Sequence, residues 1–187
     1  MDVAAFEFTA RADPGTPPGE EVRALYYEHA AALSAGLRRL AGRSEVDDLL
    51  QEVFVVALRR APALLAADSP RAWLYGVALR VAGAARRRDR IRQFFNLGAV
   101  LETPGDADPS LDLERRQTVD QVHAALGKLS AKKREVLVLF ELEGLSGQEI
   151  AQALDCPLKT VWTRLHHGRR ELEAHLLALR ATDGGAP

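Results

Sequence analysis

The chain has 187 residues, 47% of them hydrophobic, and its 25 Lys and Arg nearly balance 26 Asp and Glu for a net charge of −1. This composition is that of an ordinary globular protein, and it excludes a disordered, collagen-like or disulfide-stapled chain, since there is a single cysteine. The N-terminus lacks the basic start and apolar core of a signal peptide, and no run reaches the roughly 18 apolar residues that span a bilayer, so we expect a cytoplasmic protein without membrane insertion.

Charge is segregated along the chain. Residues 23–95 carry a net charge of +6 and residues 121–180 carry +2, whereas residues 96–120 between them carry −4. A basic block in a cytoplasmic protein is compatible with a polyanionic partner, although such a block is more often a solvated helix face. Charge alone therefore leaves the function open.

The N-terminal half begins with a leader and a long helix. Three prolines and two glycines within residues 12–20 predict that residues 1–20 form a flexible leader. Apolar residues then recur at helical spacing from Val22 to Leu40, which predicts an amphipathic helix that ends near Ala41.

Two further helices complete an N-terminal domain over residues 21–95. Ser44 and Asp47 have the spacing of a capping box at the start of the second helix. Ser69 followed by Pro70 marks the start of the third helix, because Ser caps a helix and Pro is tolerated at its first position. This third helix passes from an apolar half into a densely basic half, which predicts a polyanion-facing end.

The C-terminal half is predicted to be a second helical domain over residues 117–180. Acidic residues and turn formers predict a linker over residues 96–116, and residues 181–187 are expected to form a flexible tail. The apolar run 136–140 has the length of a buried strand, but its charged flanks at helical spacing favour a helix capped by Ser130. The predicted fold is therefore all-α, with two small helical domains joined by an acidic linker.

The helix after Ser130 is expected to bury Val136, Leu139 and Leu142 and to end at Gly144.

A helix-turn-helix pattern follows. Ser146 and Glu149 form a capping-box pattern that opens a short helix. Cys156-Pro157 supplies a tight connection, and a longer helix then runs from Leu158 with an apolar stripe that includes Val161 and Leu165. The polar and basic face left over fits a DNA major groove. Spacing alone leaves an αα-hairpin inside a generic bundle as an equal alternative.

Three segments match one known family in order and separation. They are DDLLQEVF (residues 47–54), RAWLYGVA (71–78) and the helix-turn-helix window 129–172. Together they resemble the extracytoplasmic-function (ECF) RNA polymerase sigma factors of the sigma-70 family. The resemblance covers most of residues 22–177, and it implies a specificity subunit that is not an enzyme and needs no cofactor or metal.

The resemblance also implies the partners: core RNA polymerase, through its β′ clamp helices and β flap, promoter DNA, and an anti-sigma factor as regulator. The residues implied for core polymerase binding are Asp47, Asp48, Leu49, Gln51, Glu52 and Phe54. The residues implied for the −10 element are Trp73, Tyr75, Arg80, Arg86, Arg87 and Arg88. The residues implied for the −35 element are Lys159, Thr160, Trp162, Thr163, Arg164, His167 and Arg169.

Several positions depart from the family pattern. Arg80 stands where Asn is usual and Ala84 where Asp often follows, so we expect base capture during melting to use other contacts or another −10 sequence. Trp162 stands where Lys or Arg is common, which removes a phosphate or guanine contact and adds a flat apolar surface for a thymine methyl or a protein partner. Thr163 replaces a usual Ser, and His167-Gly168 replaces a typical Arg-Ala.

Some side chains have ordinary explanations. Trp73 is expected to be partly core, and Tyr75 is left open between core packing and stacking on single-stranded bases. Cys156 is expected to pack structurally at the turn. No phosphate-cradling glycine loop, catalytic triad motif or metal-ligand spacing is found, so catalysis is not expected.

Two alternatives stay open. The chain is compatible with a stand-alone helix-turn-helix regulator, or with a degenerate sigma paralogue that binds polymerase but melts DNA poorly, as Arg80 and Ala84 indicate. Asp48→Arg or Phe54→Ala discriminates, because a sigma factor should lose polymerase binding while a regulator should keep all of its DNA binding.

Overall fold

The computed structural model describes residues 17–41, 45–95 and 113–183. Within these ranges every regular element is helical and no strand occurs, which confirms the all-α prediction. No helix in the same ranges is long and apolar enough to cross a membrane. Most of the expected leader, the Ser44 cap, most of the expected linker and the end of the tail lie outside the described residues.

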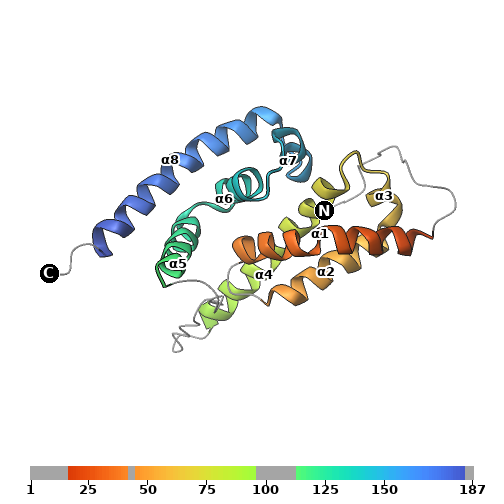
Figure 1. Ribbon diagram of the computed structural model, residues 1–187, viewed down its shortest axis with the longest axis horizontal. Coiled ribbons are helices and arrows are strands. Elements are labelled where there is room, and N and C mark those ends of the chain that lie inside the picture. Colours follow the sequence, from red (N-terminus) through yellow and green to blue (C-terminus); the bar gives the residue numbers. More distant parts are fainter. Residues whose placement is uncertain (1–16, 42–44, 96–112, 184–187) are drawn as a thin grey trace.

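The N-terminal half forms a helical bundle (Figure 1). Its helices are α1 (Pro18–Ala41), α2 (Val46–Arg59), α3 (Ala61–Leu65) and α4 (Pro70–Phe95). Helix α1 begins three residues before the expected start of the domain, because proline is tolerated in the first helical turn. The hydroxyl of Ser69 accepts a hydrogen bond from the amide of Ala72 at 3.1 Å, so the predicted cap of α4 is confirmed.

The core of this bundle is where α1, α2 and α4 meet. Leu33, Leu37, Val53 and Leu74 are fully buried there. Each such side chain contributes about 1.5–3 kcal/mol to stability when it leaves water. The buried aliphatic seam therefore holds the three helices in fixed relation and determines which faces of α2 and α4 remain outside.

The C-terminal half contains five helical elements. They are α5 (Leu113–Lys128), α6 (Ala131–Leu137), the π-helical turn η1 (Val138–Leu142), α7 (Gly147–Ala153) and α8 (Leu158–Asp183). Helix α8 runs along the outside of α5, α6 and α7 (Figure 1). Val161 and Leu165 turn inward from α8 and are buried, as predicted.

The π-helical turn changes which side chains face the core. The amide of Glu143 donates to the carbonyl of Val138 at 3.0 Å, a bond five residues back instead of four. This wider turn rotates the end of the segment, so Leu142 is 46% exposed and its predicted burial is wrong. Gly144 then ends the helix with a φ of +66°, which is the left-handed conformation that glycine adopts without strain.

Arg134 joins α5 to α6 from a buried position. Its side chain donates to the carbonyl oxygens of Leu126 at 2.7 Å, Gly127 at 3.1 Å and Leu129 at 2.7 Å. These carbonyls lie at or just beyond the C-terminal end of α5, where backbone acceptors lack helical partners. The guanidinium therefore supplies the missing donors and fixes the angle between the two helices.

The two halves of the chain pack against each other through α4 and α7 and through α1 and η1. Where α4 crosses α7, a Cβ on Gly76 would lie 3.1 Å from the carbonyl oxygen of Ala153. Only a residue without a side chain allows α4 and α7 to approach this closely without a shift of the backbone. The two domains therefore form one closed arrangement.

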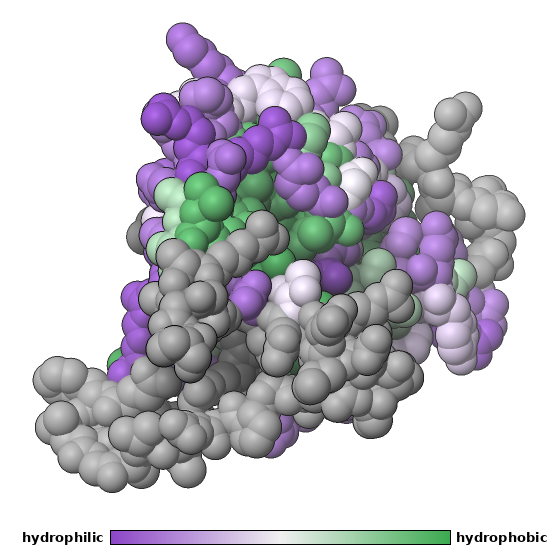
Figure 2. Space-filling view, turned by 60° about the vertical axis from the view of Figure 1, so that its left-hand side comes forward, coloured by the Kyte–Doolittle hydropathy of each residue, from purple (hydrophilic) through white to green (hydrophobic). Residues whose placement is uncertain are grey.

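One face of the molecule exposes apolar side chains. The face that appears when the left-hand side of Figure 1 is turned forward carries a patch of apolar side chains bordered by hydrophilic ones (Figure 2). Helix α5 and the C-terminal half of α8 lie on that side (Figure 1). Val119 of α5 is 42% exposed and Leu177 of α8 is 59% exposed.

Candidate nucleic-acid interface

Helix α2 presents an acidic face to solvent. Asp47, Asp48, Gln51 and Glu52 are all exposed. The two aspartates occupy the first turn, where the partial positive charge of the helix N-terminus favours carboxylates. Glu52 also lies 3.9 Å from the guanidinium of Arg88 on α4, an exposed pair that contributes little to stability. The face is therefore available to a partner.

Two residues of the same predicted set face the core instead. Leu49 is 4% exposed and Phe54 is 7% exposed. The ring of Phe54 packs edge-on against Tyr26 of α1, with centroids 4.8 Å apart. In this arrangement Leu49 and Phe54 hold α2 on the bundle, so substitution of either tests folding as much as binding.

Two apolar residues of α2 are exposed, although helical periodicity assigns one of them, Leu58, to the buried face of the helix. Val55 is 44% exposed and Leu58 is 53% exposed, one turn apart on the helix. The signal was the run VFVVAL, which contains more apolar residues than one face of a helix can bury. Val55 and Leu58 therefore lie on the outside and add apolar area to the surface of α2.

Helix α4 carries the basic residues predicted for the −10 element. Arg80, Arg87 and Arg88 are exposed, while Trp73 is half-buried, as expected for a partly core residue. Arg86 is half-buried and donates to the carbonyl of Leu40 at the end of α1, at 3.2 Å.

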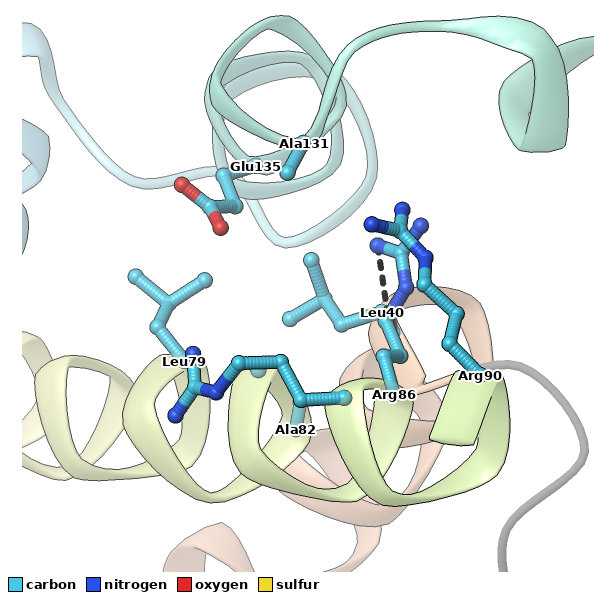
Figure 3. A pocket seen from close by; sticks show the side chains of 9 residues that line it. Leu40, Leu79, Ala82, Arg86, Arg90, Ala131 and Glu135 are labelled. Atoms are coloured by element: carbon cyan, nitrogen blue, oxygen red, sulfur yellow. Dashed lines mark hydrogen bonds between the residues drawn. The ribbon is translucent and has the colours of Figure 1, made fainter. Parts of the chain in front are cut away.

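A cavity of about 280 Å³ lies between α4 and α6 (Figure 3). Arg86 and Arg90 of α4 reach over it, and Glu135 of α6 lies on the opposite wall. Burial lowers the pKa of the Arg86 guanidinium, and the positive charge of Arg90 adds to that effect. Burial raises the pKa of Glu135, which the charges of Arg164, Arg86 and Lys132 partly oppose. The cavity is thus a basic cleft with one opposing carboxyl group.

Tyr75 is buried beneath the C-terminal half of the chain. It is 1% exposed, and its hydroxyl donates to Glu143 Oε2 at 2.6 Å. Glu143 Oε1 accepts from Arg39 Nη1 at 2.7 Å, and Arg71 donates to the Glu143 backbone carbonyl. Burial, together with the carboxylate of Glu143, raises the pKa of Tyr75 above its usual range. Tyr75, left open by the sequence, is therefore a core residue of the interdomain contact in this arrangement.

A second polar contact between the halves involves the capping box of α7. The amide of Ser146 donates to Glu149 Oε2 at 2.9 Å, and the amide of Glu149 donates to the hydroxyl of Ser146 at 3.2 Å, so the predicted capping box is confirmed. The free oxygen, Glu149 Oε1, accepts from the hydroxyl of Ser69 at 2.9 Å. Burial alone raises the pKa of Glu149, but these hydrogen bonds and the charge of Arg71 outweigh it, and the net shift is downward.

The start of α8 presents an outward face of mixed polar and apolar character. Lys159, Trp162, Thr163 and His167 are exposed there, and Thr160 is half-buried. The hydroxyl of Thr163 donates to the backbone carbonyl of Lys159 at 2.9 Å. The structure thus brings most of the residues predicted for the −35 element onto one surface.

Two arginines of that predicted set have partners within the chain. Arg164 is half-buried with Nη1 3.7 Å from Sγ of Cys156, which packs at the turn as expected. Arg169 forms an ion pair of 2.6 Å with Glu141 and lies over the ring of Phe140, 5.5 Å from its centroid. Arg170, which belongs to the polar and basic face predicted for this helix, is exposed.

Comparison with known proteins places this arrangement in a family. Two family models match, "Sigma-70 region 2" over residues 25–91 and "Sigma-70, region 4" over residues 120–172. The chain is 32% identical over 161 residues to the RNA polymerase sigma factor CnrH of Cupriavidus metallidurans, which covers 81% of this chain and 84% of CnrH. It is 33% identical to the ECF RNA polymerase sigma factor SigL of Mycobacterium tuberculosis, over 86% of this chain and 92% of SigL. The chain is an ECF sigma factor of the sigma-70 family.

Solved structures agree with this assignment. The sigma factor superposes on CnrH, in a structure of CnrH in complex with the cytosolic domain of CnrY, with a TM-score of 0.65 and 26% identity, over 88% of this chain and 91% of that chain. The fold also resembles that of the sigma factor RpoE in complex with the anti-sigma factor NepR from Bartonella quintana, with a TM-score of 0.63 and 24% identity, over 84% of this chain and 97% of that chain.

The family regions coincide with the two packed halves. Region 2 covers most of α1, all of α2 and α3 and most of α4, so it contains the acidic face of α2 and the basic half of α4. Region 4 contains α6, η1, α7 and the first half of α8. The Tyr75–Glu143 hydrogen bond therefore joins region 2 to region 4 of the sigma factor.

Proposed function

We propose that this sigma factor binds bacterial core RNA polymerase in the cytoplasm and directs it to promoters, as a specificity subunit and not as an enzyme. The observation that carries the proposal is that one chain exposes both an acidic face on region 2 and a polar, cationic face at the start of α8 in region 4. A single subunit with two separate recognition faces can hold polymerase and DNA in a fixed position relative to each other.

Region 2 supplies the polymerase contact in this proposal. Asp47, Asp48, Gln51 and Glu52 face the β′ clamp helices, and the exposed Val55 and Leu58 add apolar area beside them. Charged and apolar groups together give both steering and burial at a protein interface. Leu49 and Phe54 act indirectly, because they hold α2 in place from the core.

Promoter DNA is divided between α4 and α8. The −10 element is assigned to α4, where Arg80, Arg87 and Arg88 are exposed and Trp73 and Arg86 are half-buried. Tyr75 becomes accessible only if region 4 moves away. The −35 element is assigned to α8, with region 4 also resting on the β flap of polymerase. The residues assigned to it are Lys159, Thr160, Trp162, Thr163, Arg164, His167 and Arg169.

Control by an anti-sigma factor is part of the proposal. The similar structures of CnrH and RpoE were determined in complexes, with the cytosolic domain of CnrY and with the anti-sigma factor NepR. We propose that the anti-sigma factor is held against both domains. The domains are proposed at residues 21–95 and 117–180 with the acidic linker 96–116 between them, and helix α5 begins within the last residues of that linker, at Leu113.

Size-exclusion chromatography with core RNA polymerase tests the polymerase contact. The sigma factor should co-elute with core polymerase, and Asp48→Arg should abolish co-elution because it reverses a charge on the exposed face of α2. Glu28→Arg is the matched control, since Glu28 is an exposed carboxylate on α1 outside that face. Failure to co-elute, with promoter DNA bound by the chain alone, would support a stand-alone regulator instead.

A further inference from the structure

The start of α8 carries an apolar strip inside its cationic face. Leu158 is 37% exposed and Trp162, one turn later, is 45% exposed. Together with Lys159, Thr163 and the two histidines at 166–167 they line an open, mostly apolar depression on the outside of the helix. Phosphate binding does not account for apolar side chains in the middle of a face that is proposed to contact DNA.

The indole of Trp162 is held in place by its neighbours. The ring packs edge-on against Phe140 of η1, with centroids 5.6 Å apart and an interplanar angle of 77°. Its outer edge lies over Gly147 at the start of α7, where an added Cβ would fall 2.6 Å from Trp162 Cζ2. Because the ring is fixed before any partner arrives, contact with it costs little conformational entropy.

The surroundings of the strip favour a polyanion. No carboxylate is among the residues that line the depression, whereas Lys159 lies within it and Arg170 is exposed farther along the same helix. Cations on a helix face bind phosphates and position the helix in the major groove, where base edges become accessible. On those edges the apolar group is the C5-methyl of thymine, since the other groups are hydrogen-bond donors and acceptors.

We propose that Trp162, with Leu158, is a specificity-determining residue that selects thymine in the −35 element by contact with its methyl group. Gly147 is a positioning residue for this contact, because the absence of its side chain lets the indole lie where it does. The inference rests on the proposed function, and it names the base that this chain reads through Trp162.

The test compares thymine with deoxyuracil, which differs only by the methyl group. Duplex DNA with a randomised upstream segment is selected for binding to the full-length sigma factor with core polymerase, and each selected thymine is then replaced by deoxyuracil. At one position or more the replacement should weaken binding about three- to fivefold, the effect of one buried methyl group. The ratio of the two affinities should fall to one in Trp162→Ala.

Two further variants separate the contact from folding. Leu177→Ala removes another exposed apolar side chain from the same helix and should keep the wild-type ratio. Gly147→Ala should lower the ratio, because the added methyl group displaces the indole, while the helical circular dichroism stays unchanged, because alanine favours helix. A Gly147→Ala variant that keeps the full ratio would contradict the positioning role.

Three results would overturn the specificity role. They are a selected site without thymine, equal binding of thymine and deoxyuracil at every position, or a ratio that Trp162→Ala leaves unchanged. If Trp162→Ala weakens only the association with core polymerase, the strip belongs to a protein interface and the inference fails. If no complex with polymerase forms, the proposed function fails, and the same selection with the sigma factor alone still decides the role of Trp162.

Discussion

The hydroxyl of Tyr75 on α4 donates a 2.6 Å hydrogen bond to Oε2 of Glu143 at the end of η1, and both residues are buried. The bond joins region 2 to region 4 within the segment that the family resemblance assigns to the −10 element. In this arrangement the sigma factor keeps Tyr75 away from solvent. Any contact of Tyr75 with DNA therefore requires the two regions to separate.

Neutralising Glu143 should open the closed arrangement. Glu143→Gln removes the negative partner of Arg39, whose side chain is 30% exposed, and weakens the acceptor for Tyr75. Partial solvent screening limits the loss to about 1–3 kcal/mol of interdomain free energy. Small-angle X-ray scattering should show a larger radius of gyration for the variant.

The matched control for this experiment is Glu173→Gln, which neutralises an exposed carboxylate of α8. The Glu173→Gln protein should give the same scattering curve as the wild type. A Glu143→Gln protein as compact as the wild type would show that the apolar contacts between α4 and α7 hold the regions together without the buried carboxylate.

The closed arrangement should weaken in alkali. The pKa of Tyr75 is raised on burial, so the folded state holds the phenolic proton more tightly than the unfolded state. The stability that Tyr75 contributes is therefore fully present below about pH 10, the ordinary tyrosine pKa, and is lost as pH rises above it. Between pH 8 and a pH above 10, the free energy of unfolding in urea should fall less for Tyr75→Phe than for the wild type. Equal decreases would contradict the role assigned to Tyr75.

Local features of the fold followed from the sequence. The caps at Ser69 and at Ser146 with Glu149 depend on residues one turn apart, and both were predicted and are present. Ser130 occupies the predicted N-cap position of α6, but its side chain makes no capping hydrogen bond there. The stripe of Val161 and Leu165 was predicted for the same reason, since periodicity along one helix determines which face is buried.

Features that depend on packing between distant segments did not follow from the sequence. Glu143 precedes a glycine at a helix end and has the pattern of a surface residue, yet Arg39 and Tyr75 from region 2 enclose it. The 3.6-residue period of an α-helix also does not predict the π-helical turn that exposes Leu142. Phe54 lies in a motif assigned to a partner, but the ring packs on α1.

The arginines of α8 should differ in their contribution to DNA binding. Arg170 is exposed, whereas Arg169 is already ion-paired with Glu141 at 2.6 Å. Arg170→Ala should therefore lower the slope of log affinity against log salt by about one, and Arg169→Ala should lower it by less. Salt titrations of promoter binding measure both slopes, and an equal or larger effect of Arg169→Ala would contradict the difference.

Arg134 should be essential to the stability of region 4. Arg134→Met keeps much of the side-chain volume but leaves the carbonyls of Leu126 and Leu129 without their donors in a buried site. Loss of charged donors to buried acceptors costs about 2–4 kcal/mol. Thermal unfolding should show the loss, while Lys132→Met, at an exposed position of the same helix, should change stability by less than about 0.5 kcal/mol.

In vitro transcription with core polymerase tests whether the chain acts as a sigma factor. Core RNA polymerase is supplied with the DNA upstream of the gene for this chain, with and without the sigma factor, and with Asp48→Arg and Glu28→Arg in parallel. We expect a transcript of defined length that requires the sigma factor, is lost with Asp48→Arg and persists with Glu28→Arg. Absence of a defined transcript, while the chain alone binds the same DNA, would contradict this expectation.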